Sequence, residues 1–361
     1  MKVIQIITIV YSLVVSCSLF AKVKVCYVGE SRRFGPINEK STNPRIAGFV
    51  LAKEMIKDFN LYIDFLFIDL GPEFSLIDKL EAGKKQGCIV YTGLITSDES
   101  LLAGPWLVKN NLFGISPTAT AEKLQSFHTH FRTLMASSEI FAENIRSFIE
   151  KKSPQKIFII SFSDDPYSLN ILGSYSHVFR KSPVTRYELN IPKGGTIDIK
   201  ELKEITSAKR SAVLFTGYDY ASLNVLEQLK KHSSSFNQNN DFIVGAPSWS
   251  FSDTLHASTK HINSFNEVYI TYFPVPHKRS LLYQKYIERY GEKPREKIAF
   301  SYDSLDFIFG CSKKTGNNKE KLFECLRKNT MFEGQSGKIT LITGKAHAKP
   351  TILIKKIKRQ V

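Results

Sequence analysis

Between Cys88 and Leu124 the sequence repeats a strand–turn–helix pattern, which leaves few folds open. Residues 88–91 and 112–115 are short apolar runs typical of buried strands. Each run is followed by a turn rich in Ser and Thr and then by the predicted start of a helix. Strands that alternate with helices form parallel sheets, and such sheets bind ligands at the carboxyl edge of their strands. We therefore predict an α/β protein whose two hydroxyl-rich turns lie together at a binding edge.

The same alternation extends along most of the chain and restarts after Pro154. Before Pro154 we predict strands at 22–28 and 62–70 and a helix at 45–59 with apolar residues at helical spacing. After it, strands are predicted at 156–162, 186–189, 212–216 and 241–244, with helices between them. A chain of 361 residues is long for one domain. The restart therefore predicts a second lobe of similar construction.

Composition supports a globular protein with a basic surface. Hydrophobic residues make up 42% and aromatic residues 12% of the chain, which is enough for a sizeable core. The net charge is +16, but the basic residues are spread out, and the one dense cluster is at 355–359. Zinc-finger spacing, RNA-binding signatures and helix-turn-helix patterns are missing from the sequence. We interpret the charge as a solvated basic surface and predict no nucleic-acid partner.

The N-terminus is typical of a secretory signal peptide. Met1 and Lys2 precede an apolar stretch, residues 3–15, that is too short for a stable membrane span. Cleavage after Ala21 would release a free protein. Alternatively, the sequence Val14-Val15-Ser16-Cys17 resembles a bacterial lipobox, in which case Cys17 would be acylated and would anchor the protein to a membrane. Both alternatives place the protein in the periplasm or cell envelope, and residues 1–21 are excluded from the fold.

Four cysteines remain outside the signal peptide, and an even count in an oxidising compartment permits disulfides. We favour the pair Cys311–Cys325, which flanks a polar loop and the start of a helix. Cys26 and Cys88 lie on strands predicted to be neighbours, so they form either a disulfide or two buried thiols. The sequence has no CxxC motif and no His/Cys cluster, so we predict no metal and no cofactor.

Several motifs, taken in order, carry a family resemblance. They are TGLITS and ISPTATAEKL in the first lobe, then FRT, DDPYS, YGEKP, AFSYDSLDFI and FEGQSGKITL. Their order over about 300 residues resembles the type I periplasmic binding proteins, close to the leucine/isoleucine/valine-binding group. The resemblance implies two doubly wound parallel-sheet lobes joined by three crossovers, with a ligand cleft between them. It implies an N-terminal lobe of 22–130 plus 273–330 and a C-terminal lobe of 131–272 plus 331–361.

The resemblance also implies a binding site. It places the ligand carboxylate on Ser97, Thr118 and Thr120, although such residues can also simply cap helices. From the second lobe it places Tyr167 and Tyr218 against the ligand, although surface aromatics are common and need no ligand.

The place where amino-acid binders carry an acid for the ligand ammonium reads Gly245-Ala246-Pro247-Ser248-Trp249-Ser250. A buried ammonium without a partner is costly. Trp249 therefore predicts an amide, an aromatic acid or another small organic ligand, unless Asp219 or Asp303 substitutes for the missing acid.

The sequence lacks the nucleophile elbow, the P-loop and the HExxH zinc motif. We therefore predict a binding protein without enzymatic activity. In this interpretation it captures a small polar ligand, such as an amino acid, amide or carboxylate, and delivers it to the membrane permease of an ABC-type importer. Its only other membrane contact would be the lipid anchor. The alternatives are a ligand-sensing module for a membrane receptor or kinase, or a degenerate scaffold without a ligand.

Overall fold

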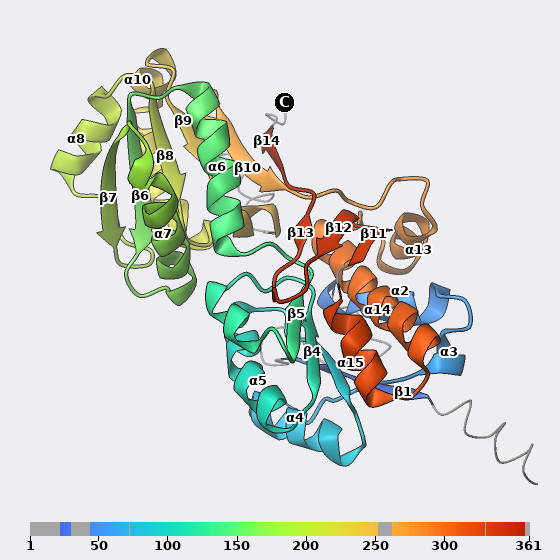
Figure 1. Ribbon diagram of the computed structural model, residues 1–361. Coiled ribbons are helices and arrows are strands. Elements are labelled where there is room, and N and C mark those ends of the chain that lie inside the picture. Colours follow the sequence, from blue (N-terminus) through green and yellow to red (C-terminus); the bar gives the residue numbers. More distant parts are fainter. Residues whose placement is uncertain (1–21, 30–43, 72, 252–261, 329, 358–361) are drawn as a thin grey trace, which may run out of the picture. The chain divides into compact units, whose positions relative to one another are not determined.

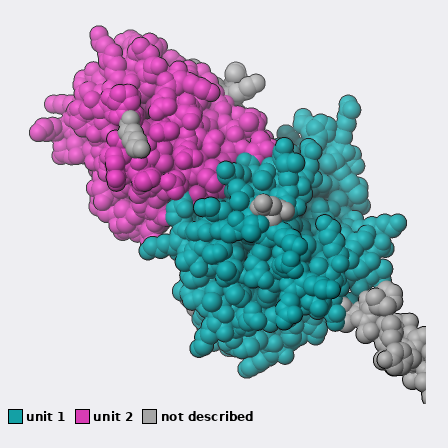
Figure 2. All heavy atoms as spheres, in the orientation of Figure 1, with its two compact units in different colours: residues 1–135, 275–350 teal, residues 136–274, 351–361 magenta. Residues whose placement is uncertain are grey.

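The structure is a computed structural model that describes residues 22–29, 44–71, 73–251, 262–328 and 330–357 (Figure 1). The chain divides into two compact units, which Figure 2 distinguishes by colour. Unit 1 comprises Met1–Met135 and Val275–Pro350, and unit 2 comprises Ala136–Pro274 and Thr351–Val361. The chain therefore passes from one unit to the other three times, after Met135, Pro274 and Pro350. The predicted signal peptide and Cys17 lie outside the described residues.

Unit 1 is built on a five-stranded parallel sheet with the strand order β2-β1-β3-β4-β5. Its strands are β1 (Val23–Val28), β2 (Ile63–Phe67), β3 (Val90–Gly93), β4 (Phe113–Ser116) and β5 (Phe131–Thr133). Both faces of the sheet are buried. In β1, Val25 and Tyr27 pack into one apolar cluster, whereas Cys26 and Val28 pack into another on the opposite face. This alternation follows from the two-residue period of a strand.

The helices of unit 1 cover the two faces of this sheet (Figure 1). One apolar cluster includes α2 (Pro44–Met55), α13 (Leu281–Tyr290), α14 (Glu296–Thr315) and α15 (Lys319–Arg327), and the other includes α4 (Leu76–Lys85) and α5 (Ser97–Lys109). A short helix, α3 (Phe59–Tyr62), leads into β2. The predicted second helix after β4 is only a 3₁₀ helix, η1 (Glu122–Phe127), because the residues before it stay extended and bond to the preceding loop.

The hairpin after α15 belongs to unit 1, which corrects the prediction that residues 331–350 lie in the second lobe. Strands β11 (Thr330–Gly334), β12 (Gly337–Leu341) and β13 (Lys349–Pro350) form a small antiparallel sheet. The buried Asp303 of α14 accepts backbone hydrogen bonds from Gln335 and Ser336 at 2.7 and 2.8 Å. These bonds fix the hairpin turn to α14, and the sequence motif alone did not reveal that partner.

Unit 2 contains a six-stranded sheet with the order β14-β10-β9-β8-β6-β7. All pairs are parallel except the edge pair β10 and β14. The strands are β6 (Lys156–Phe162), β7 (Thr185–Ile191), β8 (Ser211–Phe215), β9 (Phe242–Val244), β10 (Val268–Tyr272) and β14 (Leu353–Lys356). Helices α6 (Ser138–Lys152) and α7 (Pro166–Val178) pack on one face, and α8 (Ile199–Ser207), α9 (Asp219–Lys230) and α10 (Ser233–Gln238) pack on the other. Two short 3₁₀ helices, η2 (Phe179–Lys181) and η3 (Pro247–Phe251), also belong to this unit.

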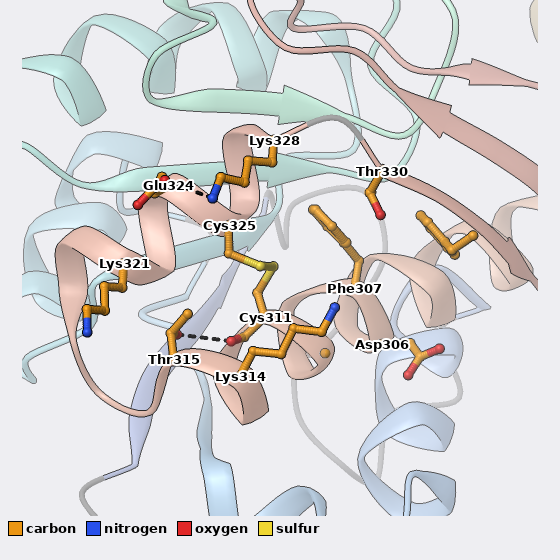
Figure 3. Close-up of a pocket in the computed structure, with 12 residues that line it drawn as sticks. Asp306, Phe307, Cys311, Lys314, Thr315, Lys321, Glu324, Cys325, Lys328 and Thr330 are labelled. Carbon is orange, nitrogen blue, oxygen red and sulfur yellow. Dashed lines mark hydrogen bonds and ion pairs between the residues drawn. A yellow bond between two sulfur atoms is a disulfide. The ribbon is translucent and has the colours of Figure 1, made fainter.

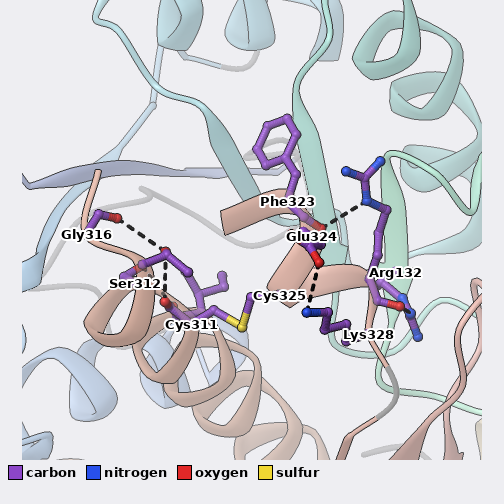
Figure 4. The surroundings of a disulfide bond; sticks show 11 residues. Arg132, Cys311, Ser312, Gly316, Phe323, Glu324, Cys325 and Lys328 are labelled. Atoms are coloured by element: carbon purple, nitrogen blue, oxygen red, sulfur yellow. Dashed lines mark hydrogen bonds and ion pairs between the residues drawn. A yellow bond between two sulfur atoms is a disulfide. The ribbon is translucent and has the colours of Figure 1, made fainter. Parts of the chain in front are cut away.

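Both disulfides lie in unit 1. Cys311–Cys325 joins α14 to α15 and is the pair that the sequence favoured (Figure 4). Cys26–Cys88 joins β1 to the segment that leads into β3, so the alternative of two buried thiols is not what the structure shows. Among the described residues, none of the helices is long and apolar enough to cross a membrane.

Candidate functional site

Two polar loops leave neighbouring strands of the unit 1 sheet. The first connects β3 to α5 and the second connects β4 to η1. Because β3 and β4 are paired and parallel, both loops begin at the same carboxyl edge. We call residues 94–97 and 116–121 the hydroxyl loops. They contain Ser97, Thr118 and Thr120, so the structure brings these three predicted site residues together.

The hydroxyl loops are joined to each other by hydrogen bonds. The Ser97 Oγ accepts the backbone N–H groups of Thr120 and Ala121, each at 3.2 Å. In return, the Thr118 Oγ1 donates to the Ile95 carbonyl at 2.7 Å. Two of the hydroxyls therefore fix the relative position of the loops, a structural role that the sequence did not predict.

Ser97 is not needed to cap α5, because its neighbour Thr96 does so. Thr96 and Glu99 form a capping box, in which the Thr96 Oγ1 accepts the Glu99 N–H at 3.2 Å and the Glu99 carboxylate accepts the Thr96 N–H at 2.8 Å. The backbone N–H groups of Ser97 and Asp98, in the first turn of α5, have no acceptor in the described part of the chain. These N–H groups lie at the positive end of the helix dipole, where an anion is stabilised.

The Ser97 hydroxyl adds a further donor. A hydroxyl can accept two hydrogen bonds and donate one, and the two acceptor positions of Ser97 are filled by Thr120 and Ala121. Its proton has no acceptor among the residues that the structure describes. One hydroxyl and two backbone amides at one helix start are suitable donors for a carboxylate.

The first hydroxyl loop is held in a strained conformation. Gly93 and Leu94 have φ angles of 102° and 26°, in the left-handed region that favours glycine. A Cβ atom on Gly93 would lie 2.2 Å from the Val28 carbonyl oxygen, so a side chain is excluded there. The Leu94 carbonyl accepts the hydroxyls of Ser100 and Ser116, at 2.8 and 2.7 Å. Sequence reasoning missed these two serines, which lie in the first turn of α5 and at the end of β4.

In unit 2 the corresponding edge carries aromatic rings. Tyr167, at the start of α7, stacks on Tyr218 with ring centroids 4.6 Å apart, and Tyr218 stacks on Tyr220 at 5.4 Å. We call these three residues the tyrosine stack. The Lys193 ammonium lies 4.9 Å from the ring centroid of Tyr220, a cation–π contact. The structure thus brings the predicted Tyr167 and Tyr218 together and adds Tyr220 and Lys193, which the sequence analysis did not include.

The hydroxyl of Tyr167 is fixed in place. It accepts the Ser248 backbone N–H at 3.1 Å. Burial raises the pKa of Tyr167 to about 12, so the hydroxyl keeps its proton at neutral pH.

Trp249 corrects one of the predictions. It has no exposed surface, and its ring packs on Phe215 at 5.2 Å and fills the space beside Gly245. Its indole N–H donates to the Gly217 carbonyl at 3.0 Å. Trp249 is therefore a core residue that supports the turn before Tyr218, and it does not present a face to a ligand. The sequence suggested a ligand contact because it does not reveal that Gly245, which has no side chain, leaves room for the Trp249 ring.

The acids that could pair with a ligand ammonium have other partners. Asp303 lies in unit 1, where its two carboxylate oxygens bind the β11–β12 turn. Asp219 is buried in the first turn of α9 and has an interaction partner of its own. Asp165 caps α7 through Oδ1, which accepts the Tyr167 N–H at 3.1 Å, whereas its buried Oδ2 has no hydrogen-bond partner among the described residues, and burial raises its pKa. Asp219 and Asp303 therefore do not replace the acid that the sequence lacked.

Comparison with known proteins identifies the fold. Neither a protein-family model nor a curated protein sequence matches the chain. Among solved structures, it is similar to the leucine-binding protein LivK of Thermotoga maritima MSB8, with a TM-score of 0.69 and 16% identity over 93% of this chain and 95% of that one. The chain has the fold of the leucine-binding solute-binding proteins.

Two further structures have the same fold with different ligands. The branched-chain amino acid transporter substrate-binding protein LivJ of Streptococcus pneumoniae, solved with isoleucine, aligns with a TM-score of 0.68, 17% identity and coverage of 94% and 97% of the two chains. A solute-binding protein of an ABC transporter from Rhodopseudomonas palustris HaA2, solved with p-hydroxybenzoic acid, aligns with a TM-score of 0.72, 11% identity and coverage of 94% and 93%. The solute-binding protein fold therefore accommodates both aliphatic amino acids and aromatic acids.

Proposed function

We propose that this chain is an extracytoplasmic solute-binding protein that captures a small organic carboxylate. The observation that carries the proposal is the set of donors at the start of α5. The N–H groups of Ser97 and Asp98 and the proton of the Ser97 hydroxyl lie at one helix start and have no acceptor within the described residues. Three donors at the positive end of a helix suit a carboxylate.

The tyrosine stack supplies the second half of the proposed site. In this account, Tyr167 and Tyr218 of unit 2 are further ligand contacts, as the resemblance to the type I binding proteins implies. Hinge closure around a ligand is the usual response of two-lobed binding proteins, and it requires only that the ligand binds the closed state more tightly. The closed form is then recognised by the membrane permease of an ABC-type importer.

We further propose an aromatic or other small carboxylic acid as the ligand, in preference to an α-amino acid. An ammonium group needs a carboxylate or several acceptors when it leaves water. The candidates Asp219 and Asp303 are engaged elsewhere, whereas the tyrosine stack supplies rigid aromatic rings that suit an aromatic ligand. The p-hydroxybenzoic acid complex of a protein with this fold is consistent with this choice.

A thermal-shift screen of the chain from Lys22 onward tests the function. We expect p-hydroxybenzoate or a related acid to raise the midpoint more than leucine does, since a ligand at about 100 times its dissociation constant stabilises by about 2.7 kcal/mol. Ser97→Ala should remove the shift, whereas Ser147→Ala, which changes an exposed hydroxyl bonded to the Glu143 carbonyl, should not. A shift of equal size in the Ser97→Ala variant would rule out the hydroxyl loops as the carboxylate site.

Export through residues 1–21 remains part of the proposal. Cleavage after Ala21 gives a free periplasmic protein, whereas acylation of Cys17 gives a lipid-anchored one. Mass spectrometry of the exported protein distinguishes the two, because only the anchored form begins at a lipid-modified Cys17. A Cys17→Ser variant that stays in the membrane fraction as the wild type does would exclude the anchor.

A further inference from the structure

Unit 1 contains a groove that lies outside the hydroxyl loops (Figure 3). Its walls are formed by α14, α15 and β11, its floor includes the Cys311–Cys325 disulfide, and its volume is about 620 Å³. Phe307 and Phe332 stack beside it with ring centroids 5.8 Å apart and nearly parallel planes. A volume of this size lies within the range of small-molecule sites, roughly 300–1,000 Å³.

Gly310 keeps the groove open. It lies in the interior of α14, where glycine is less favourable than alanine. A Cβ atom built on Gly310 would meet no other atom within 4 Å. The packing of the described residues therefore gives no reason for a glycine at this position. A bound molecule that lies against the backbone of α14 would explain the glycine, because a side chain at position 310 would occupy the space of that molecule.

The charges around the groove favour an anion. Lys328 is paired with Glu324 at 2.8 Å, so this pair is neutral (Figure 4). The ammonium groups of Lys314 and Lys321 form no hydrogen bond or ion pair with any described residue, and Lys314 extends toward Phe307 in Figure 3. The opposing charge is Asp306, which is half-buried and whose pKa is raised by burial. Two unpaired lysines against one carboxylate leave the groove positive.

We propose that the groove between α14, α15 and β11 binds a small aromatic anion against Gly310, with its ring beside Phe307 and Phe332 and its negative charge near Lys314. Lys314 and Lys321 attract the anion, and Asp306 opposes it. This site is separate from the hydroxyl loops and does not depend on the proposed transport function.

A fluorescence titration with 8-anilino-1-naphthalenesulfonate tests the proposal, because this probe combines an aromatic body with a sulfonate. The wild-type chain from Lys22 onward should bind the probe at a saturable site. Gly310→Leu should weaken binding by about tenfold or more, since the side chain would occupy the groove from a Cβ atom that meets no other atom within 4 Å. Lys314→Gln should weaken binding by about threefold, and Asp306→Asn should strengthen it by a similar factor.

Matched controls separate the groove from general effects on the protein. Gly173→Leu changes another helical glycine whose Cβ direction is open, and Lys313→Gln removes the same charge from the neighbouring position of α14, which does not line the groove. Both should leave probe affinity within about twofold of wild type. Ser97→Ala should also leave it unchanged, which makes the test independent of the hydroxyl loops.

The thermal midpoint of each variant shows that it is folded. Wild-type affinity in a folded Gly310→Leu variant would overturn the proposal, as would equal effects of Lys314→Gln and Lys313→Gln. Saturable binding that Gly310→Leu removes, with opposite effects of the Lys314 and Asp306 substitutions, would support it.

Discussion

The two units share one strand plan but carry different chemistry on it. The unit 1 order β2-β1-β3-β4-β5 matches the unit 2 order β7-β6-β8-β9-β10, read from the corresponding edge. The loop after β3 therefore corresponds to the loop after β8, and the loop after β4 to the loop after β9. In unit 1 these loops carry Ser97 and Thr118, whereas in unit 2 they carry Tyr218 and Trp249. One edge is polar and hydrogen-bonded, and the other is aromatic and stacked.

This difference shows that a shared scaffold does not fix the role of a loop. Thr118 and Trp249 occupy corresponding loops, yet Thr118 is half-exposed and joins two loops, while Trp249 is buried in the core. Ligands bind at the carboxyl ends of strands in such sheets, but the side chains decide which loops are available. The two units can therefore be tested separately for stability and for binding.

Removal of the Cys26–Cys88 disulfide should produce the largest difference in stability between the two units. This bond closes a loop with a sequence separation of 62, and unit 2 contains no cysteine. Cys26→Ala together with Cys88→Ala should lower the free energy of unfolding by about 4 kcal/mol, from the chain-entropy model. Hydrogen exchange should show faster exchange in unit 1, with unit 2 unchanged. Equal loss of protection in both units would show that they unfold as one.

Trp249→Ala should produce the converse result. The side chain is buried, and its indole N–H is bonded to Gly217. Truncation of a buried tryptophan costs about 3 kcal/mol or more, and the loss should appear in unit 2. Urea unfolding of the variant measures it. A loss below about 1 kcal/mol would mean that the ring is not part of the core, and Trp249 would again be a candidate ligand contact.

Each unit also contains one buried aspartate whose pKa is raised by burial to about 6, Asp303 in unit 1 and Asp241 in unit 2. An unfolded aspartate titrates near about 3.9. The folded state thus binds these protons more tightly than the unfolded state does. Their contribution to stability is full below about pH 4 and is lost as the pH rises through about 6. Unfolding measured from pH 4 to pH 7 should show this fall.

Substitution by Asn should distinguish the two aspartates. Asp303 uses both oxygens to accept bonds from Gln335 and Ser336, so Asp303→Asn should cost about 1–3 kcal/mol at pH 7. In Asp241 a single oxygen, Oδ1, accepts both bonds from Ser211, at 2.5 and 2.9 Å. Asp241→Asn keeps that acceptor and should therefore cost less than Asp303→Asn at pH 7. Equal destabilisation by the two substitutions would contradict these hydrogen-bond patterns.

The smallest effect concerns one helical glycine in each unit. Gly310 of α14 and Gly173 of α7 both have open space in the Cβ direction. Alanine at either position should raise the free energy of unfolding by up to about 1 kcal/mol, because alanine favours the helix. Thermal unfolding of the two variants measures this difference. Destabilisation at Gly310 alone would mean that the groove is not open in the free protein.

Much of the fold was predictable because its signals are local. Apolar runs such as residues 156–162 gave the strands, and the hydroxyl-rich turns gave the positions of Ser97, Thr118 and Thr120. The motif order added the type I binding-protein fold, which the solved structures support. These features depend on neighbours in the sequence or on the family pattern.

The features that the sequence did not reveal depend on distant partners. Gly245 leaves a gap that Trp249 fills, and Asp303 binds a turn more than 30 residues away, at Gln335 and Ser336. The hydrogen bonds of Ser97 to the second hydroxyl loop are equally nonlocal. The lining of a binding site was therefore harder to predict than its position in the fold.

The central claim is that the start of α5 holds a carboxylate while the tyrosine stack contacts the rest of the ligand. A nuclear magnetic resonance titration with p-hydroxybenzoate tests it directly through the backbone amides of Ser97 and Asp98 and the ring of Tyr167. We predict saturable shifts at all three positions with one common dissociation constant. Saturable binding that leaves the two amides of α5 unmoved would contradict the account.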